Sequence, residues 1–438
     1  MVRLIGLLMS VFTLLACATT AQVNSSANDT LNNYTFSDYY DLDSSLKEKY
    51  PFIHFEKNNF QFYTPQSPNW DNLYLNIQKM ITEKDRKLNF YHIGGSHLQA
   101  DIYTHDIRTK LQTTWEGVPG ERGFVFPFDL AKTNNPANYE FSSPNNWKSF
   151  RSVSKDKCDL TYGLLGAIVT CPDSVIKIHF HHDISKVKPT FSKIRIFHNK
   201  GEFPYDLNFG DQEGCISEKR TNPEIGYTDV FFSESMDTFD LKITKTKTSP
   251  FELQISAFQL TNDEPGISYT TIGVNGAALY TYLKCGNFEE QLRLSQPDFF
   301  AFSVGTNDAY VPFERFKPEV YKANLEKMIK MVFKANPQCA ILLTVPNDSY
   351  LHKQHINKNT ARQREVIIEL ATKYQLPVWD LYGVMGELGS AKTWLNADLM
   401  RPDMVHFSAV GYHLKGDLYF DAFMKWLEQM EVIQQVKD

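Results

Sequence analysis

The sequence has no run of basic residues and no excess of positive charge. Its 438 residues include 45 lysines and arginines against 51 aspartates and glutamates, which gives a formal net charge of −6. Proteins that bind nucleic acids gather lysine and arginine on one surface to neutralise phosphates. The composition therefore gives no support to a nucleic-acid partner.

Cysteine is also scarce, and its spacing gives no sign of zinc or thiol-redox motifs. None of the six cysteines forms a C-x-x-C pair. Five of them follow Cys17, so in an oxidising compartment at least one has no partner within the chain. Cys158 and Cys171 flank a short segment and could close a hairpin as a disulfide or stay reduced, and their spacing does not decide between the two. The remaining cysteines are Cys215, Cys285 and Cys339.

The long hydrophobic run of the chain is confined to its start, MVRLIGLLMSVFTLLACATTAQ. Arg3 precedes an apolar stretch and then small residues, which is the pattern of a secretory signal peptide, and the stretch is too short to span a membrane. We expect residues 1–21 to be removed by cleavage after Ala21. Alternatively, LLAC is a lipobox, which would make Cys17 a lipidated N-terminus and the protein an outer-membrane lipoprotein. Both alternatives predict a periplasmic or secreted location.

After this leader, the chain contains a β-to-α step. Residues 88–93 form a short apolar run, and Leu98, Ile102, Ile107 and Leu111 then follow with the spacing of a single helix. From residue 266 onward the same order returns, because buried-strand patterns such as DFFAFSVG and CAILLTV alternate with amphipathic helices. Strands that alternate with helices indicate a parallel sheet covered on both faces.

The middle of the chain has a different pattern. Residues 119–265 contain short runs of alternating polarity, such as VIKIHFHH and TFDLKITKT, separated by Gly, Pro, Asn and Asp, which is typical of an all-β module. We therefore predict a three-layer α/β/α domain with a parallel, doubly wound sheet. Residues 22–118 and 266–438 would form this domain, and the β module at 119–265 would interrupt it.

Polar signals follow several of the predicted strands. Ser96 follows a glycine pair, Gly276 lies in GVNGA, Asn307 lies in GTND, and Asp403 and His406 lie three residues apart in DMVH. In open parallel sheets, reacting groups gather at the carboxyl ends of the strands. A serine nucleophile needs a base, the base needs an orienting carboxylate, and the oxyanion intermediate needs hydrogen-bond donors. Each of these parts is present.

Each signal taken alone also has an ordinary structural interpretation. A serine after glycines is commonly a helix cap, and GTND is a common turn. The spacing of Asp403 and His406 also arises by chance. The functional prediction depends on their order at successive strand ends, which neither a cap nor a turn requires.

The ordered blocks GGSH, GVNGA, GTND and DMVH resemble the four blocks of the SGNH (GDSL-type) hydrolases. The resemblance implies the SGNH hydrolase fold and a serine esterase, with Ser96 as nucleophile, His406 as base and Asp403 as the carboxylate that orients it. It also implies an oxyanion hole formed by the N–H groups of Ser96 and Gly276 and by the side-chain amide of Asn307. The implied mechanism needs no metal and no cofactor.

A narrower resemblance concerns the substrate. SHLQAD, RGFVFPFDLAKTNNP and YTTIGVNGA are similar to the branch that contains bacterial peptidoglycan O-acetylesterases, in which a β-sandwich similar to carbohydrate-binding modules interrupts the hydrolase. This resemblance implies a secreted enzyme that removes O-acetyl groups from a glycan, with peptidoglycan as the expected substrate. Three alternatives stay open: a peptidoglycan O-acetyltransferase, an acetyl esterase for another polysaccharide, and a glycan-binding protein with a weakened active site.

The chain departs from the family pattern at one position of the first block. The family has Gly-Asp-Ser-His where this chain has Gly94-Gly95-Ser96-His97. The missing aspartate forms hydrogen bonds around the nucleophile loop and is not a proton carrier. We therefore expect a looser loop and an activity that is reduced but not abolished.

A histidine-rich segment, HFHHD, raises the question of a metal site. His179 and His181 would share one face of a strand, with His182 and Asp183 beside them, and imidazole is a suitable zinc ligand. Alternating histidines on an edge strand are more often half-exposed polar residues. We therefore predict no metal site.

Overall fold

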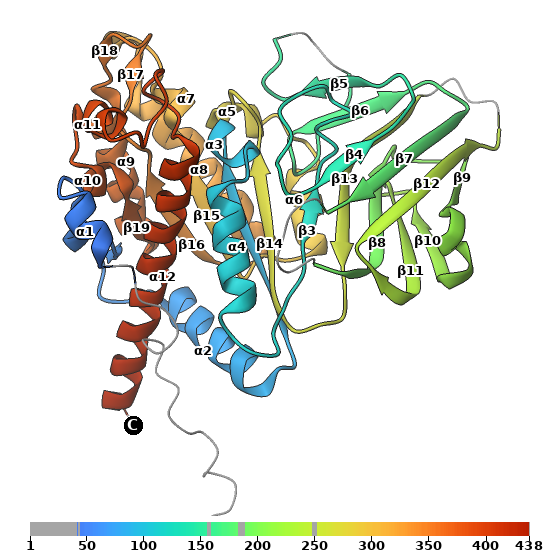
Figure 1. Cartoon of the computed structure of the whole chain (residues 1–438), viewed down its shortest axis with the longest axis horizontal. Coiled ribbons are helices and arrows are strands. Elements are labelled where there is room, and N and C mark those ends of the chain that lie inside the picture. Colours follow the sequence, from blue (N-terminus) through green and yellow to red (C-terminus); the bar gives the residue numbers. More distant parts are fainter. Residues whose placement is uncertain (1–41, 43, 156–158, 183–188, 248–251, 438) are drawn as a thin grey trace, which may run out of the picture. The chain divides into compact units, whose positions relative to one another are not determined.

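The computed structural model describes residues 42, 44–155, 159–182, 189–247 and 252–437 (Figure 1). These residues belong to the larger of two units, Thr35–Asp438. The predicted signal peptide and Cys17 lie outside the described residues. Within the described part of the chain, no helix is both long enough and apolar enough to cross a membrane.

A six-stranded sheet forms the centre of the α/β part (Figure 1). Its spatial order is β1 (Phe60–Phe62), β19 (Pro377–Asp380), β16 (Ala340–Val345), β15 (Phe299–Ser303), β2 (Lys87–Gly94) and β14 (Gly266–Gly273). β1 pairs with β19 in the antiparallel direction, and all other neighbours are parallel. The predicted parallel sheet is therefore present, with one antiparallel strand at its edge.

Alternate residues of the central strands face two different helical layers. Phe90 and Phe299 pack in one buried cluster with residues of α2, α4 and α12, whereas Tyr91 and Phe300 pack in another with residues of α8 and α9. Helices therefore cover both faces of the sheet, which is a three-layer α/β/α arrangement. The helices are α1 (Ser45–Lys49), α2 (Pro68–Glu83), α3 (Ser96–Gln99), α4 (Tyr103–Thr113), α5 (Leu279–Tyr282), α6 (Phe288–Leu294), α7 (Thr306–Ala309), α8 (Pro318–Ala335), α9 (Asn359–Tyr374), α10 (Leu381–Met385), α11 (Ser390–Asn396) and α12 (Ala409–Lys437).

The segment after β2 does not form the single helix that its spacing predicts. α3 and α4 are separated by Asp101, which has a φ of 47°. A residue in the left-handed region cannot continue a right-handed helix. The apolar spacing misled the prediction because Leu98 and Ile107 both face the core, although they belong to different helices.

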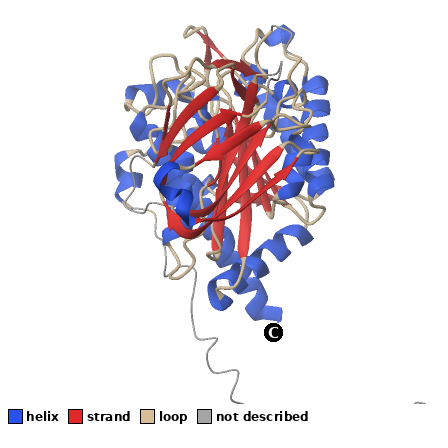
Figure 2. Ribbon diagram, turned by 90° about the vertical axis from the view of Figure 1, so that its right-hand side faces the viewer, coloured by secondary structure: helices blue, strands red, loops and turns tan. Residues whose placement is uncertain are grey.

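Residues 123–261 supply two antiparallel sheets (Figure 2). One has the order β10–β11–β8–β13–β6–β5, with β3 also paired to β13, and the other has the order β4–β7–β12–β9. The strands are β3 (Gly123–Val125), β4 (Glu140–Ser142), β5 (Lys148–Arg151), β6 (Ala167–Cys171), β7 (Val175–His181), β8 (Phe191–His198), β9 (Tyr205–Asn208), β10 (Ile216–Asn222), β11 (Tyr227–Met236), β12 (Thr238–Lys245) and β13 (Leu253–Thr261). The ring centroid of Phe258 lies 5.0 Å from that of Phe141 and 5.9 Å from that of Phe239, so aromatic side chains join the two sheets.

The chain leaves the central sheet after α4 and returns to it at β14, which pairs directly with β2. All strands between these two points belong to the antiparallel sheets. The domain limits 22–118, 119–265 and 266–438 stay predictions, as does the likeness of the middle segment to a carbohydrate-binding module.

The histidines of β7 have carboxylate neighbours. His179 Nδ1 lies 2.9 Å from Asp240 Oδ1, and His181 Nε2 lies 3.8 Å from Glu140 Oε2. Asp183, the last residue of that motif, lies outside the described residues. Among the side chains that the structure describes, no group of three His, Cys, Asp or Glu is placed to hold a metal ion.

The described cysteines are free thiols. They are Cys171, Cys215, Cys285 and Cys339. The considered pairing of Cys158 with Cys171 lies outside the described residues, because Cys158 is not among them.

Candidate active site

The carboxyl end of β2 carries the first predicted site residue. β2 ends at Gly94, Gly95 is the N-cap of α3, and Ser96 is the first residue of that helix. β2 lies between β14 and β15, so the segments that follow these parallel strands meet at one edge of the sheet. Gly276 follows β14 and Asn307 follows β15. The fold therefore brings three of the predicted residues to the same edge.

Ser96, His406 and Asp403 form a continuous chain of hydrogen-bonding groups. Ser96 Oγ lies 2.7 Å from His406 Nε2, and His406 Nδ1 lies 3.0 Å from Asp403 Oδ2. Both distances fall within hydrogen-bond range. Ser96 and His406 are 310 positions apart in sequence. They meet because the end of β2 and the turn before α12 lie at the same edge of the central sheet.

The turn before α12 fixes the orientation of Asp403. Its Oδ1 accepts the backbone N–H groups of Val405 (2.8 Å) and His406 (2.9 Å), which leaves Oδ2 facing the imidazole. Burial raises the pKa of Asp403, but the hydrogen bonds from the His406 ring and from the two backbone N–H groups outweigh this effect and hold the pKa well below its usual range. Asp403 is therefore ionised at neutral pH and can hold the His406 ring with its Nδ1 protonated.

Gly276 and Asn307 belong to two loops that hydrogen-bond to each other. The Ala277 N–H donates to Val274 O (2.9 Å), which closes a turn in which Gly276 has a φ of +84°. Glycine adopts this conformation without steric cost. Asn307 Nδ2 donates to Ala277 O (2.9 Å), so the amide proposed as an oxyanion donor is anchored beside the Gly276 turn.

Gly95 lies in close contact with both of these loops. A Cβ atom at this position would stand 3.0 Å from Asn307 Nδ2, 3.3 Å from Ala277 O and 3.8 Å from Val274 O. The absence of a side chain therefore lets the Asn307 amide approach the nucleophile backbone. This contact changes the meaning of the departure from the family pattern, because the Cβ of an aspartate would press on the amide and Asn307 would have to shift by a few tenths of an ångström.

Two residues that support these loops had no role assigned from the sequence. Asp308 accepts the backbone N–H of Leu279 through both carboxylate oxygens (3.3 and 3.2 Å), and burial raises the pKa of Asp308 to about 7. Gln99 accepts the N–H of Asn275 (2.7 Å) and donates to Asn134 O (2.7 Å). Gln99 therefore links the Gly276 turn to the loop that precedes β4. Both lie within the quoted motifs GTND and SHLQAD, but a motif string does not show which partner a side chain reaches.

His97 is a further residue whose position only the structure reveals. Its ring centroid lies 5.1 Å from that of His406, and its Nδ1 lies 2.9 Å from Tyr412 Oη. Burial lowers the pKa of His97 well below its usual value, and the charges of Lys415 and His406 act in the same direction. His97 is therefore a neutral ring packed beside His406.

Comparison with known proteins adds a family relationship. Residues 255–414 match the GDSL-like Lipase/Acylhydrolase family. The match contains Gly276, Asn307, Asp403 and His406. Ser96 lies before the match in sequence, separated from it by most of the antiparallel strands. No curated protein matches the chain.

Several solved structures are similar to this one. A peptidoglycan O-acetylesterase aligns with 84% of this chain and 99% of its own, with a TM-score of 0.70 and 20% identity. A lipase/acylhydrolase from Enterococcus faecalis (22% identity, TM-score 0.30) aligns with 36% of this chain and 77% of its own. An acetyl xylan esterase (20% identity, TM-score 0.29) aligns with 36% of this chain and 80% of its own. The first of these shows that this chain shares its fold, the SGNH hydrolase fold, and residues 255–414 are similar to the GDSL-like lipase/acylhydrolase family.

Proposed function

We propose that this protein is a secreted serine esterase that removes O-acetyl groups from a glycan, with peptidoglycan as the favoured substrate. The observation that carries the proposal is the hydrogen-bonded chain from Ser96 Oγ through His406 to Asp403. This arrangement has the geometry that nucleophilic attack by a serine requires.

The proposed reaction passes through an acyl-enzyme. Ser96 Oγ attacks the acetyl carbonyl carbon while His406 Nε2 takes the hydroxyl proton, and Asp403 stabilises the imidazolium that forms. The carbon–oxygen bond to the sugar then breaks, and His406 returns the proton to the departing sugar oxygen. Water, deprotonated by His406, attacks the acetyl-serine, and its collapse releases acetate and restores the Ser96 hydroxyl.

Negative charge on the acetyl oxygen would be stabilised by three donors. These are the backbone N–H groups of Ser96 and Gly276 and the Nδ2 amide of Asn307. Ser96 is the first residue of α3, whose first N–H groups have no partner within the helix. The bond from Asn307 Nδ2 to Ala277 O uses one amide hydrogen and leaves the other for the substrate. Removal of one oxyanion donor typically costs about 10²–10³-fold in kcat.

The glycan part of the proposal has separate support. The alignment with the peptidoglycan O-acetylesterase covers 84% of this chain, which is more than residues 22–118 and 266–438 contain, so it includes part of the segment that forms the antiparallel sheets. The substrate is proposed by analogy with that protein. The segment 119–265 would then act as a module similar to carbohydrate-binding modules.

Acetate release tests the proposal. Wild type and Ser96→Ala are compared on O-acetylated peptidoglycan and on acetylated xylan, with Ser217→Ala, an exposed serine of β10, as matched control. We expect wild type and Ser217→Ala to release acetate from peptidoglycan, and Ser96→Ala to lose about 10⁴-fold or more in kcat. Equal acetate release by all three proteins would exclude the mechanism. Acetate release from xylan alone would identify acetylated xylan, and not peptidoglycan, as the substrate.

The same assay separates hydrolysis from acetyl transfer. An acetyl donor is supplied with and without a de-acetylated glycan acceptor, and the acetate and the acetylated glycan are both measured. We expect free acetate in both cases. Acetylated glycan as the main product would identify a transferase, and no product of either kind would favour a binding protein.

We also propose a periplasmic or secreted location, on the basis of residues 1–21. Cell fractionation and mass spectrometry of the mature protein test this proposal. A mature chain that begins at Gln22 supports cleavage, and a lipidated Cys17 supports an outer-membrane lipoprotein. An uncleaved protein in the cytoplasm would exclude both.

A further inference from the structure

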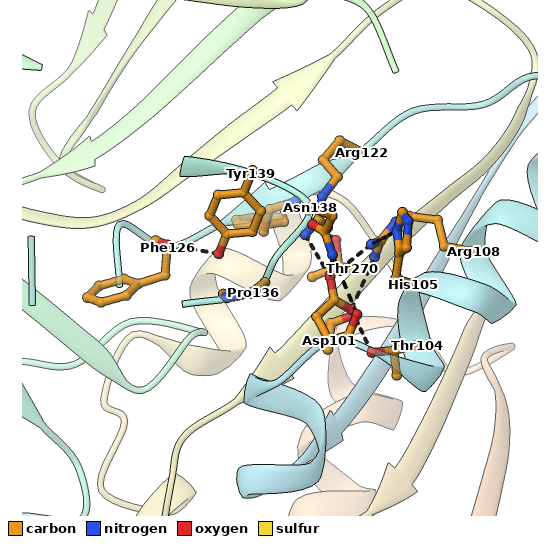
Figure 3. Close-up of polar contacts among 12 residues, drawn as sticks. Asp101, Thr104, His105, Arg108, Arg122, Phe126, Pro136, Asn138, Tyr139 and Thr270 are labelled. Atoms are coloured by element: carbon orange, nitrogen blue, oxygen red, sulfur yellow. Dashed lines mark hydrogen bonds and ion pairs between the residues drawn. The ribbon is translucent and has the colours of Figure 1, made fainter. Parts of the chain in front are cut away.

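Asp101 lies where the α/β part meets the segment that leads into the antiparallel sheets (Figure 3). Its buried carboxylate accepts hydrogen bonds from Arg108 (2.8 Å), Arg122 (3.1 Å), Asn138 (2.9 Å) and Thr271 (3.0 Å). Arg108 belongs to α4 and Thr271 to β14, whereas Arg122 and Asn138 flank β3 in sequence. A single carboxylate therefore joins three parts of the fold.

Two buried guanidinium groups face this one carboxylate. The side chains of Asp101, Arg108 and Arg122 are 2%, 3% and 5% exposed. Among the described residues, Asp101 is the one carboxylate whose charge acts on Arg122. Burial and the neighbouring Arg108 lower the pKa of Arg122 to about 10, which leaves it protonated at neutral pH. Among the groups that the structure describes, the cluster therefore holds one positive charge more than it has negative charges, away from water, which is unfavourable.

A cavity of about 20 Å³ opens beside the two arginines. Its lining includes His105, Arg108, Arg122, Asn138, His182 and Pro189. Within the described part of the chain, four buried atoms of this lining have no hydrogen-bond partner: Arg122 Nε and Nη1, Asn138 Oδ1 and His182 Nε2. Buried polar atoms without partners are rare in native proteins. The lining is therefore incomplete without an occupant.

We propose that this cavity binds a small monovalent inorganic anion of the size of chloride. The volume admits a single particle about as large as a water molecule. Arg122 Nε and Nη1 supply two N–H donors from one guanidinium group. A water molecule would satisfy the Asn138 oxygen but would leave the extra charge of the arginines uncompensated, whereas an anion compensates it.

The two histidines of the lining do not supply the positive charge. Burial, followed by the charge of Arg108, lowers the pKa of His105 to about 4, and burial followed by the charge of Arg122 lowers that of His182 to about 3. Both rings are therefore neutral at pH 7. The anion would be held by the guanidinium charge and would not need acidic conditions.

An anion titration of the full-length protein tests this inference, which does not depend on the proposed esterase activity. Potassium gluconate, whose anion is too large for the cavity, is exchanged for potassium chloride or bromide at constant ionic strength, and Tm is recorded. We expect a saturable rise of about 2–4 °C in the wild type. In a crystal grown with bromide, an anomalous peak is expected within hydrogen-bond distance of Arg122.

Variants separate specific binding from a general salt effect. Arg122→Gln removes the donor charge and should abolish the rise, whereas Arg195→Gln should keep it, because Arg195 is paired with Asp229 (2.6 Å) outside this cavity. His182→Glu places a carboxylate in the cavity and should also abolish the rise, with a Tm in gluconate above that of His182→Gln. This pair keeps the test decisive if Arg122→Gln fails to fold.

Two results would overturn the inference. One is an equal halide response in the wild type, Arg122→Gln and His182→Glu. The other is a bromide crystal without an anomalous peak in the cavity, which would show that it holds water.

Discussion

Replacing Gly95 with aspartate restores the residue that the family has beside its nucleophile. The structure predicts that this change lowers activity. The new Cβ would stand 3.0 Å from Asn307 Nδ2, which is closer than ordinary van der Waals contact, and it would lie 3.3 and 3.8 Å from the backbone oxygens of Ala277 and Val274. The amide of Asn307 must therefore move by a few tenths of an ångström.

The expected loss follows from the part that Asn307 plays in the proposed mechanism. Complete loss of one oxyanion donor costs about 10²–10³-fold, or about 2.7–4 kcal/mol, and sets the upper limit. A displacement of about 1 Å costs about 10²-fold, so a shift of a few tenths of an ångström should cost roughly 3- to 10-fold. The aspartate charge adds to this loss because it repels the oxyanion. We therefore expect Gly95→Ala to lose roughly 3- to 10-fold in kcat and Gly95→Asp to lose more.

The assay is acetate release by Gly95→Ala, Gly95→Asp and wild type at equal concentrations of folded protein, with Tm measured for each. Gly214→Asp is the matched control, because a Cβ at Gly214 would meet nothing within 4 Å and the charge change is the same. The control should keep wild-type kcat.

The opposite outcome for Gly95→Asp would refute this reasoning. If Gly95→Asp had higher activity and a higher Tm than wild type, the aspartate would support the loop, as the sequence comparison alone suggests. If Gly95→Asp and wild type had equal activity and equal Tm, neither displacement of Asn307 nor support of the loop by the aspartate would explain the role of this position.

Three further predictions concern residues that orient the site. Asp403→Asn should lower kcat by about 10²–10⁴-fold. Because folding lowers the pKa of Asp403, the ionised carboxylate stabilises the fold above the usual carboxyl pKa, and this stabilisation is lost as the pH falls. Urea unfolding should therefore show that the variant is less stable than wild type at pH 7 and equally stable in strong acid. The raised pKa of Asp308 favours the folded state only while the carboxyl group is protonated, so the wild type should lose on the order of 2–4 kcal/mol of unfolding free energy as pH rises from about 4 through about 7. Asp308→Asn should not show this loss. Identical profiles of unfolding free energy against pH for the two proteins would contradict the prediction. Gln99→Ala should lower the free energy of unfolding by about 1–2 kcal/mol, because it leaves the partly buried Asn275 N–H without its acceptor, and an unchanged urea midpoint would exclude that role.

The fold class followed from the sequence because hydrophobic periodicity reports burial directly. The continuous apolar runs at 299–303 and 340–345 predicted strands buried on both faces, and they are the central parallel strands β15 and β16. The alternating runs after residue 119 predicted half-buried strands, and β7 and β12 have that pattern.

The break between α3 and α4 did not follow from the sequence. The apolar residues on both sides keep helical spacing, and Asp101 is an ordinary residue for an exposed helix position. Its left-handed conformation is held by Arg108 and Arg122, and Arg122 reaches it from beyond α4. A contact of this kind leaves no local signal.

The sequence by itself determined which chemical groups this protein has and the order in which they follow its strands. That order was sufficient for the SGNH resemblance, because parallel strands must deliver their following loops to one edge. The tertiary structure decided the distances: it placed Ser96 Oγ 2.7 Å from a histidine 310 positions away, and it placed the Asn307 amide against Gly95. Such contacts depend on how segments far apart in the chain pack together, so only the folded protein shows that the residue before the nucleophile lies against the Asn307 amide.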